Sequence, residues 1–154
     1  MDLWEVIARE SIRDLVARYN ACGDAGRFDD VMALFAPDAT MELVVDGETR
    51  AFEGLGEIRA IFTGTRETWA DDATAAGVPA YVRHSVSTHQ IDLMDPTHAT
   101  GRAYFQVIRA HGLDHWGRYL DRYEERDGQW RFTFRRATAD GWSAGSGSAA
   151  PRRR

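Results

Sequence analysis

Apolar residues recur every three or four positions in the first half of the chain, which is the spacing of amphipathic helices. This spacing predicts three helices, over residues 3–22, 28–35 and 57–69. Asp2 is suited to cap the first helix and Gly23 to end it, while Pro37 is expected to end the second. Residues 70–80 are small and acidic and include a glycine and a proline, and we therefore expect a loop there.

Polar and apolar residues alternate over longer stretches in the second half. The alternation predicts four long strands, over residues 81–94, 98–111, 114–126 and 129–139. Two shorter strands, 41–45 and 49–53, are joined by Asp46-Gly47, which is a strong hairpin signal. Helices followed by such strands predict an α+β domain, with the helices on one face of a curved sheet. A curved sheet of this kind leaves a cone with one open end, which suits a small apolar ligand.

The length of 154 residues fits one domain, which we place at residues 1–140. Residues 141–154 are mostly Gly, Ser and Ala and end in three arginines, so a flexible tail is expected there. No apolar run is long enough to span a bilayer, and the acidic N-terminus does not have the form of a signal peptide. These features favour a cytoplasmic protein.

The composition excludes several kinds of chemistry. The net charge of −5 offers no basic field for nucleic acid or an anionic membrane. All 19 basic residues are arginines, so an enzyme that uses lysine as nucleophile or base is excluded. The single cysteine, Cys22, rules out an internal disulfide and any site that needs several cysteines.

The residues that could carry chemistry are Asp24 and five histidines. Strand alternation places His84 on the interior face and His89 on the outer face, and His98 is expected to be solvated beside a turn. His111 and His115 flank a turn, and this H-x₃-H spacing is not a helical metal motif, so no metal site is expected. An aspartate that faces a histidine in an apolar cavity makes the imidazole a general base.

Several sequence segments between Ile12 and Thr138 are typical of one known family. They are Ile12-Arg13-Asp14-Leu15 with Tyr19 and Asp24, then residues 28–39, Gly54 to Ile58, Arg83-His84 and residues 121–132. With them the chain resembles the nuclear transport factor 2-like superfamily in its SnoaL-like branch. The resemblance implies a cone-shaped α+β fold, nuclear transport factor 2-like or cystatin-like, with a mixed but mostly antiparallel sheet around three helices and the pocket in the mouth of the cone.

The resemblance also implies candidate catalytic residues. Scytalone dehydratase, bile acid 7α-dehydratase and a dehydrochlorinase in this branch share an Asp–His pair that matches Asp24 and His84. The other matches are Tyr19, Arg135 or Arg136 on the last strand, and a second pocket histidine, His111 or His115. The implied function is a cofactor-independent lyase of the dehydratase type, in which Asp24 orients His84 for proton abstraction from a small, largely apolar substrate. We expect the substrate to contact Trp69, Phe105, Val107, His115 and Tyr119.

Other functions remain open on the same fold. One alternative is an isomerase, a polyketide cyclase or an epoxide hydrolase, the last with Asp24, Arg109 and Asp121 as its candidate set. Another is a non-catalytic ligand-binding or assembly module. Whatever the function, the outer face of the sheet is expected to pair copies of the chain as a dimer or trimer through apolar side chains, namely Trp116, Leu120 and Phe132.

Overall fold

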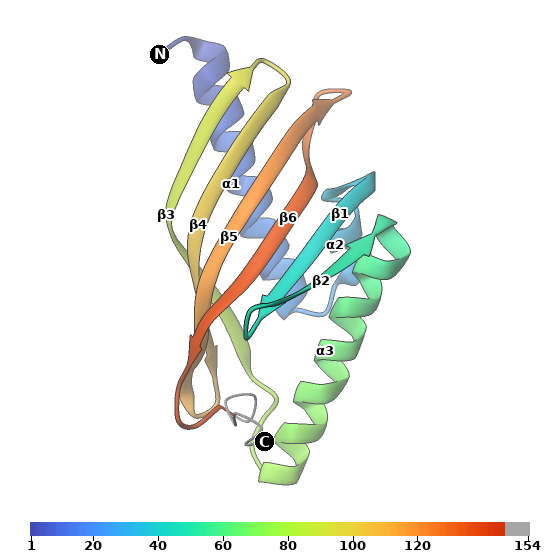
Figure 1. Cartoon of the computed structure of the whole chain (residues 1–154), viewed down its shortest axis with the longest axis vertical. Helices are drawn as coiled ribbons and strands as arrows, with labels where there is room; N and C mark the ends of the chain where they lie inside the picture. The colour runs from blue at the N-terminus through green and yellow to red at the C-terminus, as the bar shows by residue number, and fades with distance from the viewer. Residues whose placement is uncertain (147–154) are drawn as a thin grey trace.

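The computed structural model describes residues 1–146, which form a six-stranded sheet with helices packed on one face (Figure 1). The strands are β1 (Phe35–Val45), β2 (Glu48–Glu53), β3 (Val82–Asp95), β4 (His98–Arg109), β5 (Gly112–Arg126) and β6 (Gln129–Trp142). They lie in the order β2-β1-β6-β5-β4-β3, and every neighbouring pair is antiparallel except β1 and β6. The predicted α+β class and the mixed, mostly antiparallel sheet are therefore confirmed.

The helices are α1 (Leu3–Asp24), α2 (Phe28–Met32) and α3 (Gly54–Ala76). In Figure 1, α1 runs behind the long strands, where it packs mainly on β3, and α3 packs against β1 and β2. The inward face of α1 is apolar and includes the buried side chains of Ile12, Val16 and Tyr19. Within residues 1–146, no helix is both long and apolar enough to cross a membrane.

The third helix is longer than the sequence pattern indicates, and the predicted loop over residues 70–80 is wrong. The helix continues to Ala76 because this stretch is rich in alanine, the best helix former, and Ala73 is buried. It ends at Gly77, whose φ of 67° is left-handed, and the Val78 N–H bonds back to the Ala73 carbonyl. The extra turns of α3 carry Asp72, whose carboxylate lies 4.0 Å from Arg109 Nη1 of β4.

The second helix is shorter than predicted, and Pro37 does not end it. The helix stops at Met32, and Phe35 already begins β1, so Pro37 lies inside a strand. The pairing of β1 with β6 is irregular between Phe35 and Thr40. Proline is tolerated at this irregularity because no N–H is needed there for the ladder.

The last strand also runs past the predicted boundary of the tail at Gly141. Gly141 and Trp142 belong to β6 and pair with Trp116 and His115 of β5. After the strand, the Ser143 N–H bonds to the Asp114 carbonyl at 2.8 Å. The rest of the predicted tail, residues 147–154, lies outside the described residues.

At two irregularities in the sheet, a residue lies on the opposite face from the one predicted. The β3–β4 register shifts between Ser87 and Gln90, where Thr88 has a φ of 51°, and His89 turns inward to lie 3.3 Å from the Tyr123 hydroxyl. The β5–β6 register shifts beside Phe132, which is fully buried. The predictions that His89 and Phe132 face outward are therefore wrong, because a bulge breaks the alternation of period two.

Candidate active site

A cavity of about 320 Å³ lies between the C-terminal end of α1, the middle of α3 and the adjoining parts of β3, β4 and β5. Its lining is largely apolar and aromatic, with side chains that include Phe28, Leu43, Ile61, Phe62, Trp69, Tyr81 and Phe105. Few polar side chains reach it, among them Asn20, Asp24, Arg66, His84, Arg109 and His115. A largely apolar cavity with a few convergent polar groups is typical of a site for a small organic molecule.

Asp24 and His84, which are 60 residues apart in the chain, meet in the wall of this cavity. The His84 Nδ1–H donates to Asp24 Oδ1 at 2.6 Å, and the main-chain N–H of His84 donates to Asp24 Oδ2 at 2.9 Å. Both carboxylate oxygens are thus used, and only 9% of the Asp24 side chain and 21% of the His84 side chain are exposed. With Nδ1 held by the carboxylate, Nε2 is the ring nitrogen left to face the cavity.

The positions of these two residues follow from their elements. α1 continues to Asp24, so that its last side chain points to the start of β3 rather than into solvent. His84 lies before the bulge in β3, where the predicted alternation still holds and directs its ring inward. The rings of Trp69 and Phe105 both lie 6.4 Å from the His84 ring and make its surroundings apolar.

A second carboxylate–imidazole pair, Asp114–His115, lies in the same cavity. The His115 Nδ1–H donates to Asp114 Oδ2 at 2.7 Å, and the His115 ring lies 6.0 Å from Phe105 and 6.4 Å from Trp69. Burial lowers the pKa of His115 and outweighs the opposing effect of the hydrogen bond that its ring donates to Asp114. Of the two histidines expected near the turn, His115 lines the cavity, whereas His111 does not.

Asp114 is fully buried, and the sequence prediction missed it. Arg109 Nη1 lies 3.8 Å from its Oδ1, and His111 Nε2 lies 3.2 Å from the same oxygen. The residue falls at the register shift between β4 and β5, where a bulge turns both Asp114 and His115 inward. An aspartate next to one histidine and three residues after another was the available signal.

Two tyrosines and an asparagine form the inner end of the cavity. The Tyr119 O–H donates to Asn20 Oδ1 at 3.2 Å, whereas the Tyr19 O–H donates weakly, to the Met41 sulfur at 4.0 Å. Burial is the main cause that raises the pKa of both tyrosines, so both hydroxyls stay protonated over the physiological pH range. Tyr19 therefore has a hydroxyl proton that it can donate to a ligand.

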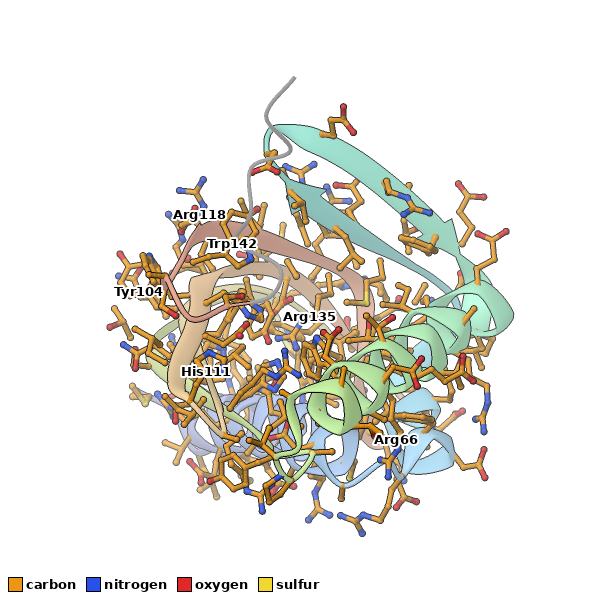
Figure 2. The ribbon with its side chains drawn as sticks, turned by 90° about the horizontal axis from the view of Figure 1, so that it is seen from below. Arg66, Tyr104, His111, Arg118, Arg135 and Trp142 are labelled. Atoms are coloured by element: carbon orange, nitrogen blue, oxygen red, sulfur yellow. The ribbon has the colours of Figure 1, made fainter. Side chains whose placement is uncertain are left out.

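Arg135 lies behind these tyrosines rather than in the cavity lining. Its guanidinium carbon is 4.1 Å from the Tyr19 ring centre and 3.9 Å from that of Tyr119. Its Nε and Nη2 donate to the two oxygens of Asp121, each at 2.8 Å. Figure 2 shows Arg135 inside the molecule, between the sheet and the helices. The neighbouring candidate, Arg136, lies on the other face of the sheet, where it pairs with Glu42 at 2.6 Å.

Other predicted site residues lie elsewhere. Val107 is fully buried and does not line the cavity, since larger neighbours cover it. Asp121 pairs with Arg135, away from Arg109, so the set expected for an epoxide hydrolase is not assembled. His98 is half exposed beside Asp95, as predicted. Within the described residues, His, Cys, Asp and Glu side chains form no group of three that could hold a metal ion.

The chain matches the model of the SnoaL-like domain over residues 4–136 and therefore belongs to that family. No curated protein matches it. Its membership agrees with the resemblance found in the sequence.

Solved structures from Novosphingobium aromaticivorans share the fold. A candidate scytalone dehydratase is 17% identical, with full coverage of both chains and a TM-score of 0.74. The beta subunit of a candidate aromatic-ring-hydroxylating dioxygenase is 21% identical over 96% of this chain and 98% of that chain, with a TM-score of 0.66. An NTF2-like protein with a cystatin-like fold is 23% identical, covers 96% and 94%, and has a TM-score of 0.68. At these identities the likeness establishes the fold alone.

Proposed function

We propose that this protein is a cofactor-independent enzyme of the lyase type, similar to a dehydratase, that acts on a small and largely apolar substrate. The observation that carries the proposal is the Asp24–His84 pair in the wall of the apolar cavity, with Nδ1 held at 2.6 Å. A histidine fixed in this way, with its second nitrogen directed at a ligand cavity, is the arrangement that general-base catalysis requires.

In the proposed reaction, His84 Nε2 removes a proton from a carbon next to a carbonyl group. The electron pair of the broken C–H bond forms a C=C bond as a C–O bond on the adjacent carbon breaks. The departing hydroxide takes the proton back from the His84 imidazolium and leaves as water, which restores neutral His84. Asp24 holds the ring through Nδ1 and stabilises the imidazolium that forms. The second hydrogen bond, from the His84 main chain, keeps the carboxylate itself in place.

Tyr19 is suited to polarise the substrate carbonyl. Its buried hydroxyl stays protonated, and its proton is donated weakly, to the Met41 sulfur at 4.0 Å. A hydrogen bond from this hydroxyl to the carbonyl oxygen would strengthen as negative charge develops there during proton removal. In this proposal Arg135 does not touch the substrate but positions Tyr19 and Tyr119 from behind.

The proposed base can be tested without the natural substrate. The probe is 5-nitrobenzisoxazole, which opens to a coloured cyanophenolate when a base removes its ring proton and the N–O bond breaks. The wild-type protein is expected to open it faster than free imidazole at equal concentration. His84→Ala and Asp24→Asn should each lose at least about tenfold of that rate, since a positioned base typically contributes about 10²–10⁴-fold.

His98→Ala is the matched control, because it removes a half-exposed histidine that also pairs with an aspartate, Asp95. This variant should keep the wild-type rate, and circular dichroism should show that all variants are folded. If His84→Ala opens the probe as fast as the wild type, the general-base proposal is wrong. Binding of apolar ligands without base catalysis would then favour the ligand-binding module.

A further inference from the structure

We infer that the Asp114–His115 pair forms a hydroxyl-binding subsite of the cavity, in which Asp114 positions His115 and His115 Nε2 accepts a hydrogen bond from a substrate O–H group. The inference rests on the proposed function, because it names the chemistry of the substrate that His84 would deprotonate. The substrate class is a cyclic compound that carries an alcohol, enol or phenol group in addition to its acidic C–H.

The tautomer of His115 follows from its contact with Asp114. An ionised carboxylate can only accept hydrogen bonds, so Asp114 Oδ2 at 2.7 Å requires the proton of a neutral ring to be on Nδ1. Arg109 Nη1 lies 3.8 Å from the other oxygen of this fully buried carboxylate and places a positive charge beside it. Nε2 then carries a lone pair, which is an acceptor and not a donor.

The charge of the His115 ring follows from its burial and its charged neighbours. Burial is the largest effect on the pKa of His115 and lowers it, and the nearby His84 and Arg109 act in the same direction against Asp114. His115 is therefore neutral at neutral pH, and a neutral imidazole with its Nδ1 occupied binds hydroxyl donors through Nε2.

The imidazoles of His84 and His115 lie in one row on the same face of the sheet. His84 pairs with Val107 across β3 and β4, and Val107 pairs with His115 across β4 and β5, so the three residues form one row of the sheet. The two histidines are thus two strand spacings apart in the backbone, about 9–10 Å, and their side chains are on the same face. Trp69 and Phe105 contact both rings, which places both imidazoles around one apolar space.

The tautomer and charge of His115, together with the positions of His84 and His115, define which groups a ligand must carry. A flat ring system between Trp69 and Phe105 would present its acidic C–H to His84 and its hydroxyl group to His115. A ligand with a methyl group in place of the hydroxyl would cover Nε2 of His115 in the largely apolar cavity without giving it a hydrogen-bond partner, which disfavours binding.

The test compares 2-naphthol with 2-methylnaphthalene, since hydroxyl and methyl groups have nearly the same volume. Binding of each is measured by its fluorescence in the wild type, His115→Phe, Asp114→Ala and the control Asp72→Asn. Asp72 is another carboxylate near Arg109, at 4.0 Å, but it does not contact His115. The ratio of the two dissociation constants should change by about tenfold in favour of the methyl compound in His115→Phe and Asp114→Ala, and stay at the wild-type value in Asp72→Asn.

A second measurement needs no ligand and separates the positioning of the His115 ring by Asp114 from a loss of folding. The ¹⁵N shifts of the His115 ring in the wild type should show Nδ1 protonated and Nε2 unprotonated, and Asp114→Ala should change this balance. An Nε2-protonated ring in the wild type, or a wild-type ligand ratio in His115→Phe, would overturn the subsite. Neither result depends on the rate of benzisoxazole opening, so a failure of the subsite and a failure of His84 as base are distinguishable.

Discussion

The buried Arg135–Asp121 ion pair beneath the cavity gives a sharp prediction about stability. Arg135→Met removes one partner and leaves the Asp121 carboxylate buried, with the Tyr123 hydroxyl as its remaining hydrogen-bond donor at 2.7 Å. The variant also loses the contacts of the guanidinium with three aromatic rings, at 3.9 to 4.3 Å from their centres. We therefore expect a large loss of stability rather than the small effect of a surface pair.

The size of the loss follows from the burial of both partners. Both side chains are essentially inaccessible, and breaking such a pair from one side typically costs about 3–5 kcal/mol. For a chain of this size, 1 kcal/mol corresponds to a shift of about 2–4 °C in Tm. The expected fall in Tm is thus about 6–20 °C. The double variant Asp121→Asn/Arg135→Met should recover part of this loss, because no unpaired charge remains buried.

The assay is urea unfolding at pH 7, followed by tryptophan fluorescence, with Arg136→Met as control. Arg136 is the next residue along β6, but it pairs with Glu42 in a part-exposed site, so its loss should cost less than about 1 kcal/mol. Equal losses in Arg135→Met and Arg136→Met would refute the reasoning. A double variant less stable than Arg135→Met would refute the account of the unpaired charge.

Two further predictions concern pH and assembly. Burial lowers the pKa of His89 and His115, so below about pH 6.5 the unfolded chain binds more protons than the folded one. The free energy of unfolding should therefore fall as the pH is lowered from 7 to 5. His89→Phe should reduce this pH dependence, measured by urea unfolding at each pH. An unchanged pH dependence in His89→Phe would contradict the burial of His89 as its cause. We also propose that the outer face of the sheet, where Figure 2 shows Tyr104 and Arg118, pairs copies of the chain through exposed apolar side chains, including Trp116 and Leu120. Sedimentation should then give a dimer or trimer that Leu120→Arg converts to monomer, whereas a wild-type monomer would contradict the proposal.

The sequence by itself determined the fold class, the presence of each helix and strand, and the inward position of His84. Apolar spacing identified all three helices, and alternation identified the strands, because each pattern reflects the side-chain period of its element. The pattern alone also directed His84 inward, since no irregularity precedes it in β3. Its partner Asp24 came only from the family resemblance, because local spacing carries no information about residues 60 positions apart.

The tertiary structure alone decided which side chains point inward where strand pairing is irregular. Bulges turned His89, Asp114 and Phe132 inward, and a bulge depends on how two distant strands fit together rather than on either strand's own pattern. The same holds for Arg135, whose place behind Tyr19 is set by the register of β6 against β1 and β5. The second carboxylate–imidazole pair is therefore a product of strand register, which only the assembled sheet fixes.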